Sequence, residues 1–131
     1  MEIHLKIIGV LLILLSLVHF DLPKRFDWKN NLAGLNLFNR QMFKVHVVFI
    51  MMMEILLGIL FFTSSVELVN TNLGKKICLG LGFFWGLRAV FQFFVYSPKL
   101  WRGKTFETII HILFSILWFY LTIIFFVIAF Q

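Results

Sequence analysis

The sequence has little charge, one cysteine and two prolines. Only 14% of its 131 residues are charged, whereas a soluble domain carries about 25%. Hydrophobic residues make up 61% of the chain, and a domain of this size leaves too much surface exposed to bury them from water. These numbers exclude an ordinary soluble enzyme, a disordered chain and a disulfide-rich secreted module. They indicate an integral membrane protein.

The single cysteine and the excess of basic residues exclude further classes. Cys78 has no second cysteine to pair with, so an internal disulfide and a CxxC metal or redox motif are excluded. Twelve basic residues against six acidic ones give a net charge of +6. In a membrane protein the positive-inside bias and attraction to anionic lipids account for such an excess. We therefore expect the lipid bilayer as a partner and no nucleic acid.

Four apolar segments are long enough to cross a bilayer, which takes about 20 residues in a helix. They lie at about 3–20, 43–62, 77–96 and 106–130. The first is followed by Pro23 and charged residues without a small-residue cleavage site, so we interpret it as a retained helix rather than a signal peptide. The sequence predicts an all-α membrane protein with a single domain over 1–131, a four-transmembrane-helix bundle running up-down-up-down with short loops.

The basic residues predict how the chain is oriented. The side of the membrane that holds the first and third loops has eight of them: Lys24, Arg25, Lys29, Arg40, Lys44, Lys99, Arg102 and Lys104. The opposite side holds three: Lys6, Lys75 and Lys76. The positive-inside rule then places loops one and three in the cytoplasm and both termini outside, and we expect a bacterial cytoplasmic membrane. Within the first loop, the mixture of Leu, Phe and Asn at about 30–40 predicts a segment lying in the membrane interface.

Two ionisable residues fall near the middle of predicted spans, where a charge is costly and indicates function. At 1.5 Å per residue, Glu54 lies about 16 Å into the second span and Arg88 about 15 Å from the end of the third. Matched depth and opposite charge predict an ion pair between them. Two interpretations stay open: the pair only fixes the register of the helices, or Glu54 and Arg88 are catalytic residues that handle a substrate or a proton.

Polar residues also gather near the predicted cytoplasmic side, and they come from all four spans: His19, His46, Gln92, Tyr96, Glu107 and His111. Imidazole and carboxylate groups together suit a transition metal, so His19, His46, His111 and Glu107 are candidate metal ligands. Alternatively, His46 and His111 are axial ligands of a b-type haem. Gln92 and Tyr96 would then be further contacts to this cofactor, or to a quinone-like amphiphile in the same place. The sequence leaves the identity of the cofactor open.

A third candidate site lies in the third loop. Lys99, Arg102 and Lys104 surround Trp101 and would hold the phosphate of a lipid headgroup while its tail enters the bundle. The positive-inside bias alone also predicts these residues.

Three function classes follow from these observations. The leading hypothesis is a redox or binding protein with a histidine-lined pocket, open to the cytoplasmic side, for a metal, a haem or a quinone-like amphiphile. The second is a membrane-embedded enzyme that acts on a lipid or isoprenoid. The third is an accessory or structural subunit of a larger membrane complex, or a homo-oligomer, in which the polar residues only fix helix packing.

Overall fold

The computed structural model describes residues 1–131, and its regular elements are all helices, with no strand. Three of these helices are long and apolar enough to cross a membrane: α4 (Leu37–Thr63), α6 (Asn72–Phe94) and α7 (Thr105–Phe130). The N-terminal helix α1 (Glu2–Val18) has 17 residues. The prediction of an all-α chain with several helices able to span a membrane is therefore confirmed, with three such helices and an N-terminal one.

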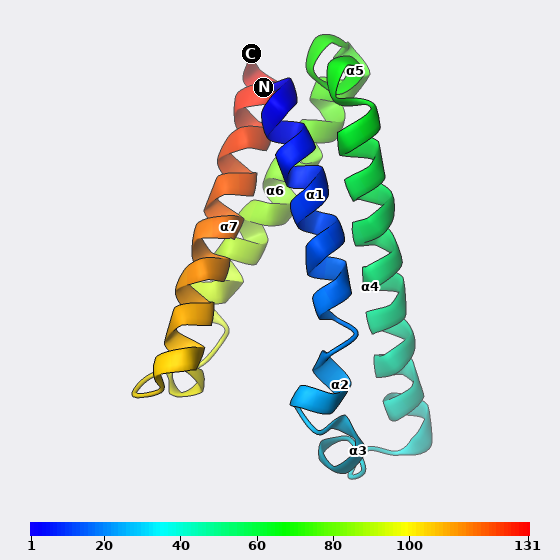
Figure 1. Cartoon of the computed structure of the whole chain (residues 1–131), viewed down its shortest axis with the longest axis vertical. Coiled ribbons are helices and arrows are strands. Elements are labelled where there is room, and N and C mark those ends of the chain that lie inside the picture. Colours follow the sequence, from blue (N-terminus) through cyan, green and yellow to red (C-terminus); the bar gives the residue numbers. More distant parts are fainter. The chain divides into compact units, whose positions relative to one another are not determined.

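The chain divides into two compact units. Residues Ile3–Ser65 form the first, the α1–α4 unit, which contains α1, two short helices and α4 (Figure 1). Residues Val66–Gln131, together with Met1–Glu2, form the second, the α6–α7 unit. The short helix α5 (Ser65–Asn70) connects them in the sequence.

Two short helices lead from α1 to α4. The first, α2 (Leu22–Arg25), has a proline in its only turn, and α3 (Trp28–Asn31) follows it. Asn36 caps the start of α4. Its side-chain oxygen accepts a hydrogen bond at 2.8 Å from the backbone N–H of Asn39, which has no carbonyl partner within the first turn of the helix. The predicted interfacial segment at about 30–40 thus holds the end of α3, a turn and the first turn of α4.

The helices α1 and α4 run antiparallel and meet backbone to backbone at two glycines (Figure 1). A Cβ atom on Gly9 would lie 2.6 Å from the carbonyl oxygen of Gly58, and one on Gly58 would lie 2.7 Å from that of Gly9. Farther along, the Ser16 hydroxyl donates a hydrogen bond to the Met51 carbonyl at 3.2 Å. Each helix uses residues seven positions apart for these two contacts, so both contacts lie on one face of each helix.

In the α6–α7 unit the two long helices form an antiparallel hairpin, joined through the short 3-10 helix η1 (Pro98–Leu100). Trp85 and Trp118 stack with their ring centroids 5.1 Å apart and an interplanar angle of 11°. Nearer the start of α6 and the end of α7, the Phe126 ring occupies the space beside Gly82. A Cβ atom added to Gly82 would lie 2.9 Å from this ring. Aromatic packing against small residues therefore holds this hairpin together.

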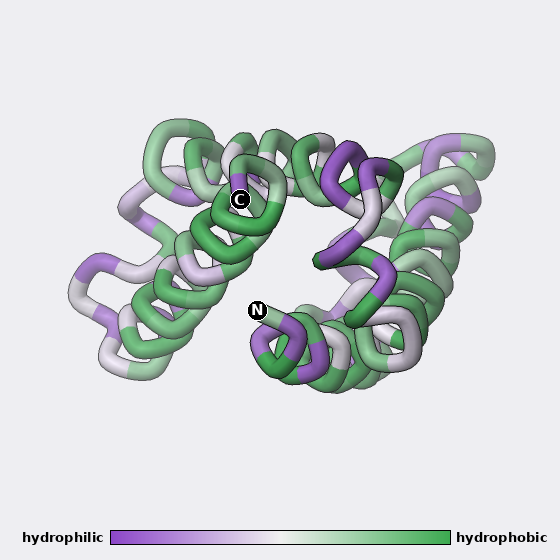
Figure 2. The backbone as a smooth tube through the Cα atoms, turned by 90° about the horizontal axis from the view of Figure 1, so that it is seen from above, coloured by the Kyte–Doolittle hydropathy of each residue, from purple (hydrophilic) through white to green (hydrophobic).

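The outer surfaces of the long helices are apolar. Hydrophobic residues predominate along the long helices, and hydrophilic ones gather at helix ends and connecting segments (Figure 2). Phe49 on α4, Phe84 on α6 and Ile116 on α7 are each 62% exposed. Large apolar patches open to water are rare in soluble monomers, whereas lipid covers such surfaces at no cost, so all three helices suit contact with a bilayer.

The glycine contact predicts a sharp effect of one added methyl group. We expect Gly9→Ala or Gly58→Ala to destabilise the fold by about 1–3 kcal/mol, because the helices must move apart to admit it. Gly80→Ala is the matched control, since no atom lies within 4 Å of a Cβ there and alanine favours a helix more than glycine does. Thermal unfolding in detergent micelles, followed by circular dichroism, measures the difference. Equal melting temperatures for all three variants would contradict the close contact.

Candidate functional site

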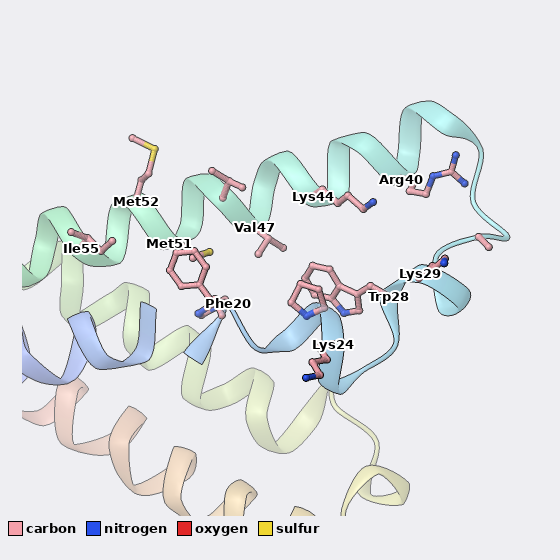
Figure 3. A pocket seen from close by; sticks show the side chains of 14 residues that line it. Phe20, Lys24, Trp28, Lys29, Arg40, Lys44, Val47, Met51, Met52 and Ile55 are labelled. Atoms are coloured by element: carbon pink, nitrogen blue, oxygen red, sulfur yellow. The ribbon is translucent and has the colours of Figure 1, made fainter. Parts of the chain in front are cut away.

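The α1–α4 unit contains a cavity of about 840 Å³. One wall consists of the end of α1 and the α2–α3 segment, and the other is a face of α4 (Figure 3). This volume is in the range of about 300–1,000 Å³ that ligand pockets occupy.

The α4 wall is one continuous stripe, and it changes from charged to apolar along the helix. Its side chains follow the helical spacing of three or four residues: Arg40, Lys44, Val47, Val48, Met51, Met52 and Ile55. From Lys44 to Ile55 this stripe extends about 16 Å along the helix axis. The two cations therefore lie at the loop end of the cavity, and the remainder of the α4 wall is aliphatic or thioether.

The opposite wall adds two more cations and an aromatic anchor. On the α2–α3 segment, Trp28 lies across from Lys44 and Val47, Lys29 lies toward Arg40, and Lys24 lies on the side of Trp28 away from α4 (Figure 3). The Trp28 ring packs edge-on against Phe43 of α4, with centroids 4.9 Å apart and an interplanar angle of 71°, so this contact holds the segment against the helix. No acidic side chain lines the cavity. Its loop end is therefore a concentration of positive charge.

His19 also lines this cavity, and the Nδ1 edge of its ring faces Glu54. The His19 Nδ1 atom lies 2.9 Å from the Leu15 carbonyl oxygen and 3.4 Å from Glu54 Oε2. Glu54 is buried, with 8% of its surface exposed, and Oε2 has no hydrogen bond at standard geometry. Because a backbone carbonyl only accepts, the short contact requires a proton on Nδ1 of His19.

A separate polar network lies in the α6–α7 unit and centres on Gln92, which is 7% exposed. Its Oε1 accepts hydrogen bonds from Arg88 Nη1 at 3.1 Å and from the Trp118 indole at 3.3 Å. Its Nε2 lies 2.7 Å from Nδ1 of His111. Arginine and tryptophan only donate, so the oxygen must face them and the NH₂ group must face the imidazole. Nδ1 of His111 is therefore the acceptor, and the neutral ring carries its proton on Nε2.

The same network supplies contacts for the charged side chain of Arg88 within the α6–α7 unit. Its Cζ lies 4.9 Å from the Trp118 ring centroid and 5.2 Å from that of Tyr96. Cation–π contacts and the bond to Gln92 give the guanidinium neutral partners within its own unit. Trp101, from the loop before α7, stacks on His111 with centroids 3.7 Å apart. These contacts tie the loop to the helix pair.

The structure divides the predicted catalytic pair between the two units: Glu54 contacts His19 in one, and Arg88 contacts Gln92 in the other. An ion pair between Glu54 and Arg88 stays a prediction.

The predicted metal ligands are divided in the same way. Within neither unit do three or more His, Cys, Asp or Glu side chains lie close enough to hold a metal ion. His46 is exposed on α4, and Glu107 is exposed in the first turn of α7. A metal or haem bound through Nε2 of His111 would require the Gln92 amide to turn and present two donors, Arg88 and Trp118, to its NH₂ group. The metal and haem sites stay predictions.

The predicted headgroup residues of the third loop are exposed and close together in sequence: Lys99, Arg102 and Lys104. Lys99 lies in η1 and Lys104 immediately precedes α7. The cavity lies elsewhere, in the α1–α4 unit, so their role as a lipid site stays a prediction.

Sequence reasoning did not find the α4 stripe, or that Lys24 and Lys29 line the same cavity. The signal was present, since Arg40, Lys44 and the apolar residues after them repeat with helical spacing. It was hidden because the helix begins at Leu37, before the apolar run at about 43. Arg40 was therefore assigned to a loop, and Lys44, at the start of the span, was counted only as a basic residue on that side of the membrane.

Comparison of the chain with protein families, with curated proteins and with solved structures gives no match in any of the three. The site must therefore be interpreted from its own geometry.

The Gln92 network predicts a defined tautomer for His111. In the wild-type protein the neutral ring should carry its proton on Nε2. Gln92→Glu replaces the NH₂ donor by a carboxylate oxygen, so the proton of His111 should move to Nδ1, or the ring should become an imidazolium. Long-range ¹⁵N–¹H correlation spectra of histidine-labelled protein in micelles distinguish these forms. The resonances of His46, in the other unit, serve as the internal control, and an unchanged His111 tautomer in the variant would contradict the assignment.

Proposed function

We propose that the protein is a small multi-span membrane protein that binds an anionic amphiphile, a lipid bearing a phosphate group, in the cavity of the α1–α4 unit. The observation that carries this proposal is the order of side chains along one face of α4. Two cations, Arg40 and Lys44, precede an apolar stripe that ends at Ile55, and two further cations, Lys24 and Lys29, line the cavity from the α2–α3 segment. This order matches an amphiphile, with an acidic group at one end and a hydrocarbon chain at the other.

The energetics indicate which part of the cavity determines selectivity among lipids. Each Lys or Arg near an anionic headgroup contributes about 1 kcal/mol, which alone gives weak binding of a phosphate. Burial of apolar surface adds about 25 cal/mol per Å² when the surface leaves water, but a lipid tail is already in an apolar solvent. The charged end of the cavity therefore supplies most of the preference over other lipids, and the aliphatic stripe supplies shape.

The placement of the cavity agrees with this assignment. Its cations lie in the α2–α3 segment and in the first two turns of α4, where a helix entering a bilayer passes the headgroups. In the proposed topology α1 also spans the membrane, in addition to α4, α6 and α7, and the α2–α3 loop lies on the cytoplasmic side, where anionic lipids are enriched. The α6–α7 network, whose polar groups are partnered among themselves, has a structural role in this proposal.

Two double variants with identical chemistry test the site. Arg40→Gln with Lys44→Gln should weaken binding of phosphatidylglycerol about ten-fold or more, because two cations of about 1 kcal/mol each are removed. Arg102→Gln with Lys104→Gln removes the same two residue types from the other basic loop and should change the affinity little. Native mass spectrometry of the purified protein, titrated with phosphatidylglycerol and with zwitterionic phosphatidylcholine, measures both.

The opposite result would relocate or remove the site. A loss confined to the Arg102 and Lys104 variant would place the headgroup at the third loop. Equal losses in both variants, or equal affinity of the wild-type protein for the two lipids, would mean that the cavity has no selective role.

A further inference from the structure

We infer that His19 makes the cavity selective for an amphiphile that carries a free hydroxyl group between its phosphate and its hydrocarbon chain, as a monoacyl glycerophosphate does. This inference rests on the proposed function and adds the class of lipid that is bound. It follows from the direction in which each polar group of the cavity donates or accepts hydrogen bonds.

The proton of His19 is on the edge of the ring that faces the protein. Nδ1 lies 2.9 Å from the Leu15 carbonyl oxygen, which only accepts, and 3.4 Å from the buried oxygen of Glu54. Nδ1 therefore carries a proton. In the neutral ring Nε2 then has a lone pair, and it forms no hydrogen bond with the chain. Because the ring lines the cavity, Nε2 is the polar atom that it offers to a ligand.

Every other strongly polar side chain of the cavity donates. Lys24, Lys29, Arg40 and Lys44 are cations without a lone pair to accept with, and the Trp28 indole is a donor as well. The remaining lining side chains are aliphatic, aromatic or thioether. Among the side chains that line the cavity, His19 is thus the one good acceptor, and the other strongly polar ones are donors. A ligand that presents only acceptors satisfies the cations and leaves Nε2 unpaired.

The depth of His19 indicates where the matching donor lies on the ligand. In the antiparallel register that pairs Ser16 with Met51, His19 is level with Val48, and its ring turns back toward Leu15. The ring therefore lies one to two helical turns, about 6–11 Å, on the apolar side of Lys44. A hydroxyl at the outer tip of a headgroup does not reach this level, whereas one that follows the phosphate on the tail side does.

Two ligands that differ by a single methyl group test the inference. The probes are 1-oleoyl-glycerol-3-phosphate and its 2-O-methyl ether, which has the same charge and chain but no hydroxyl proton. We expect the wild-type protein at pH 8 to bind the hydroxyl form about ten-fold more tightly, since an unmet buried acceptor is costly. In His19→Phe, which keeps a flat ring of similar shape, the ratio should fall to about one. His4→Phe, at the other end of α1, is the matched control and should keep the wild-type ratio.

The outcomes separate this inference from the proposed function. If both probes bind equally and binding still depends on Arg40 and Lys44, the role of His19 is overturned and the anion site stays intact. A doubly protonated His19 ring would give this result, because its Nε2–H donates to an ether oxygen as well as to a hydroxyl. A hydroxyl preference that persists in His19→Phe also overturns it. If neither probe binds, the proposed function and the inference both fail. His19→Gln, whose amide can accept at a similar reach, should recover part of the preference, so a misfolded phenylalanine variant does not decide the question.

Discussion

The close approach of Gly9 and Gly58 is the contact on which the α1–α4 unit depends. With no side chain on either residue, the two backbones touch, and this sets how far apart the helices lie and which residues face each other. Seven residues along each helix, Ser16 then reaches the Met51 carbonyl. In the same register His19 contacts Glu54, and the imidazole ring of His19 lines the cavity. In a lipid-embedded helix pair, where hydrophobic burial gives little driving force, such close packing is the main source of association.

Beyond that contact, the direction of hydrogen bonds distinguishes the two best-defined histidines. His19 has its proton on Nδ1 because that atom faces acceptors, and His111 has its proton on Nε2 because Gln92 presents an NH₂ group to it. The neutral rings therefore offer opposite chemistry at Nε2, a lone pair in His19 and a proton in His111. Residue type alone would treat them as equivalent ligands. Their partners make the first suited to bind a donor, and the second suited to hold a helix pair and a loop together.

Composition and hydropathy were sufficient to predict an all-helical chain with long apolar helices, since these depend on local sequence. Depth along a helix also identified residues of both polar networks, including Glu54 and His19 in one and Arg88, Gln92 and His111 in the other. Which side chains contact each other depends on how neighbouring helices are rotated and aligned, and sequence spacing does not determine that rotation or alignment. That is why Glu54 was matched with Arg88 by depth and charge, while the structure gives each of them a partner within its own unit. The helix start at Asn36 was likewise hidden, because a cap at the polar end of a helix adds no hydropathy signal.

The central claim is that an anionic amphiphile lies along the face of α4 that runs from Arg40 to Ile55. Photo-crosslinking tests it most directly, with a monoacyl phosphate carrying a diazirine in its chain, irradiated in membranes containing the protein and mapped by peptide mass spectrometry. The account predicts labels concentrated on the stripe side chains Val47, Met51 and Ile55. Labels spread evenly over the exposed faces of α4, α6 and α7, or gathered beside Trp101 and Lys104, would contradict it.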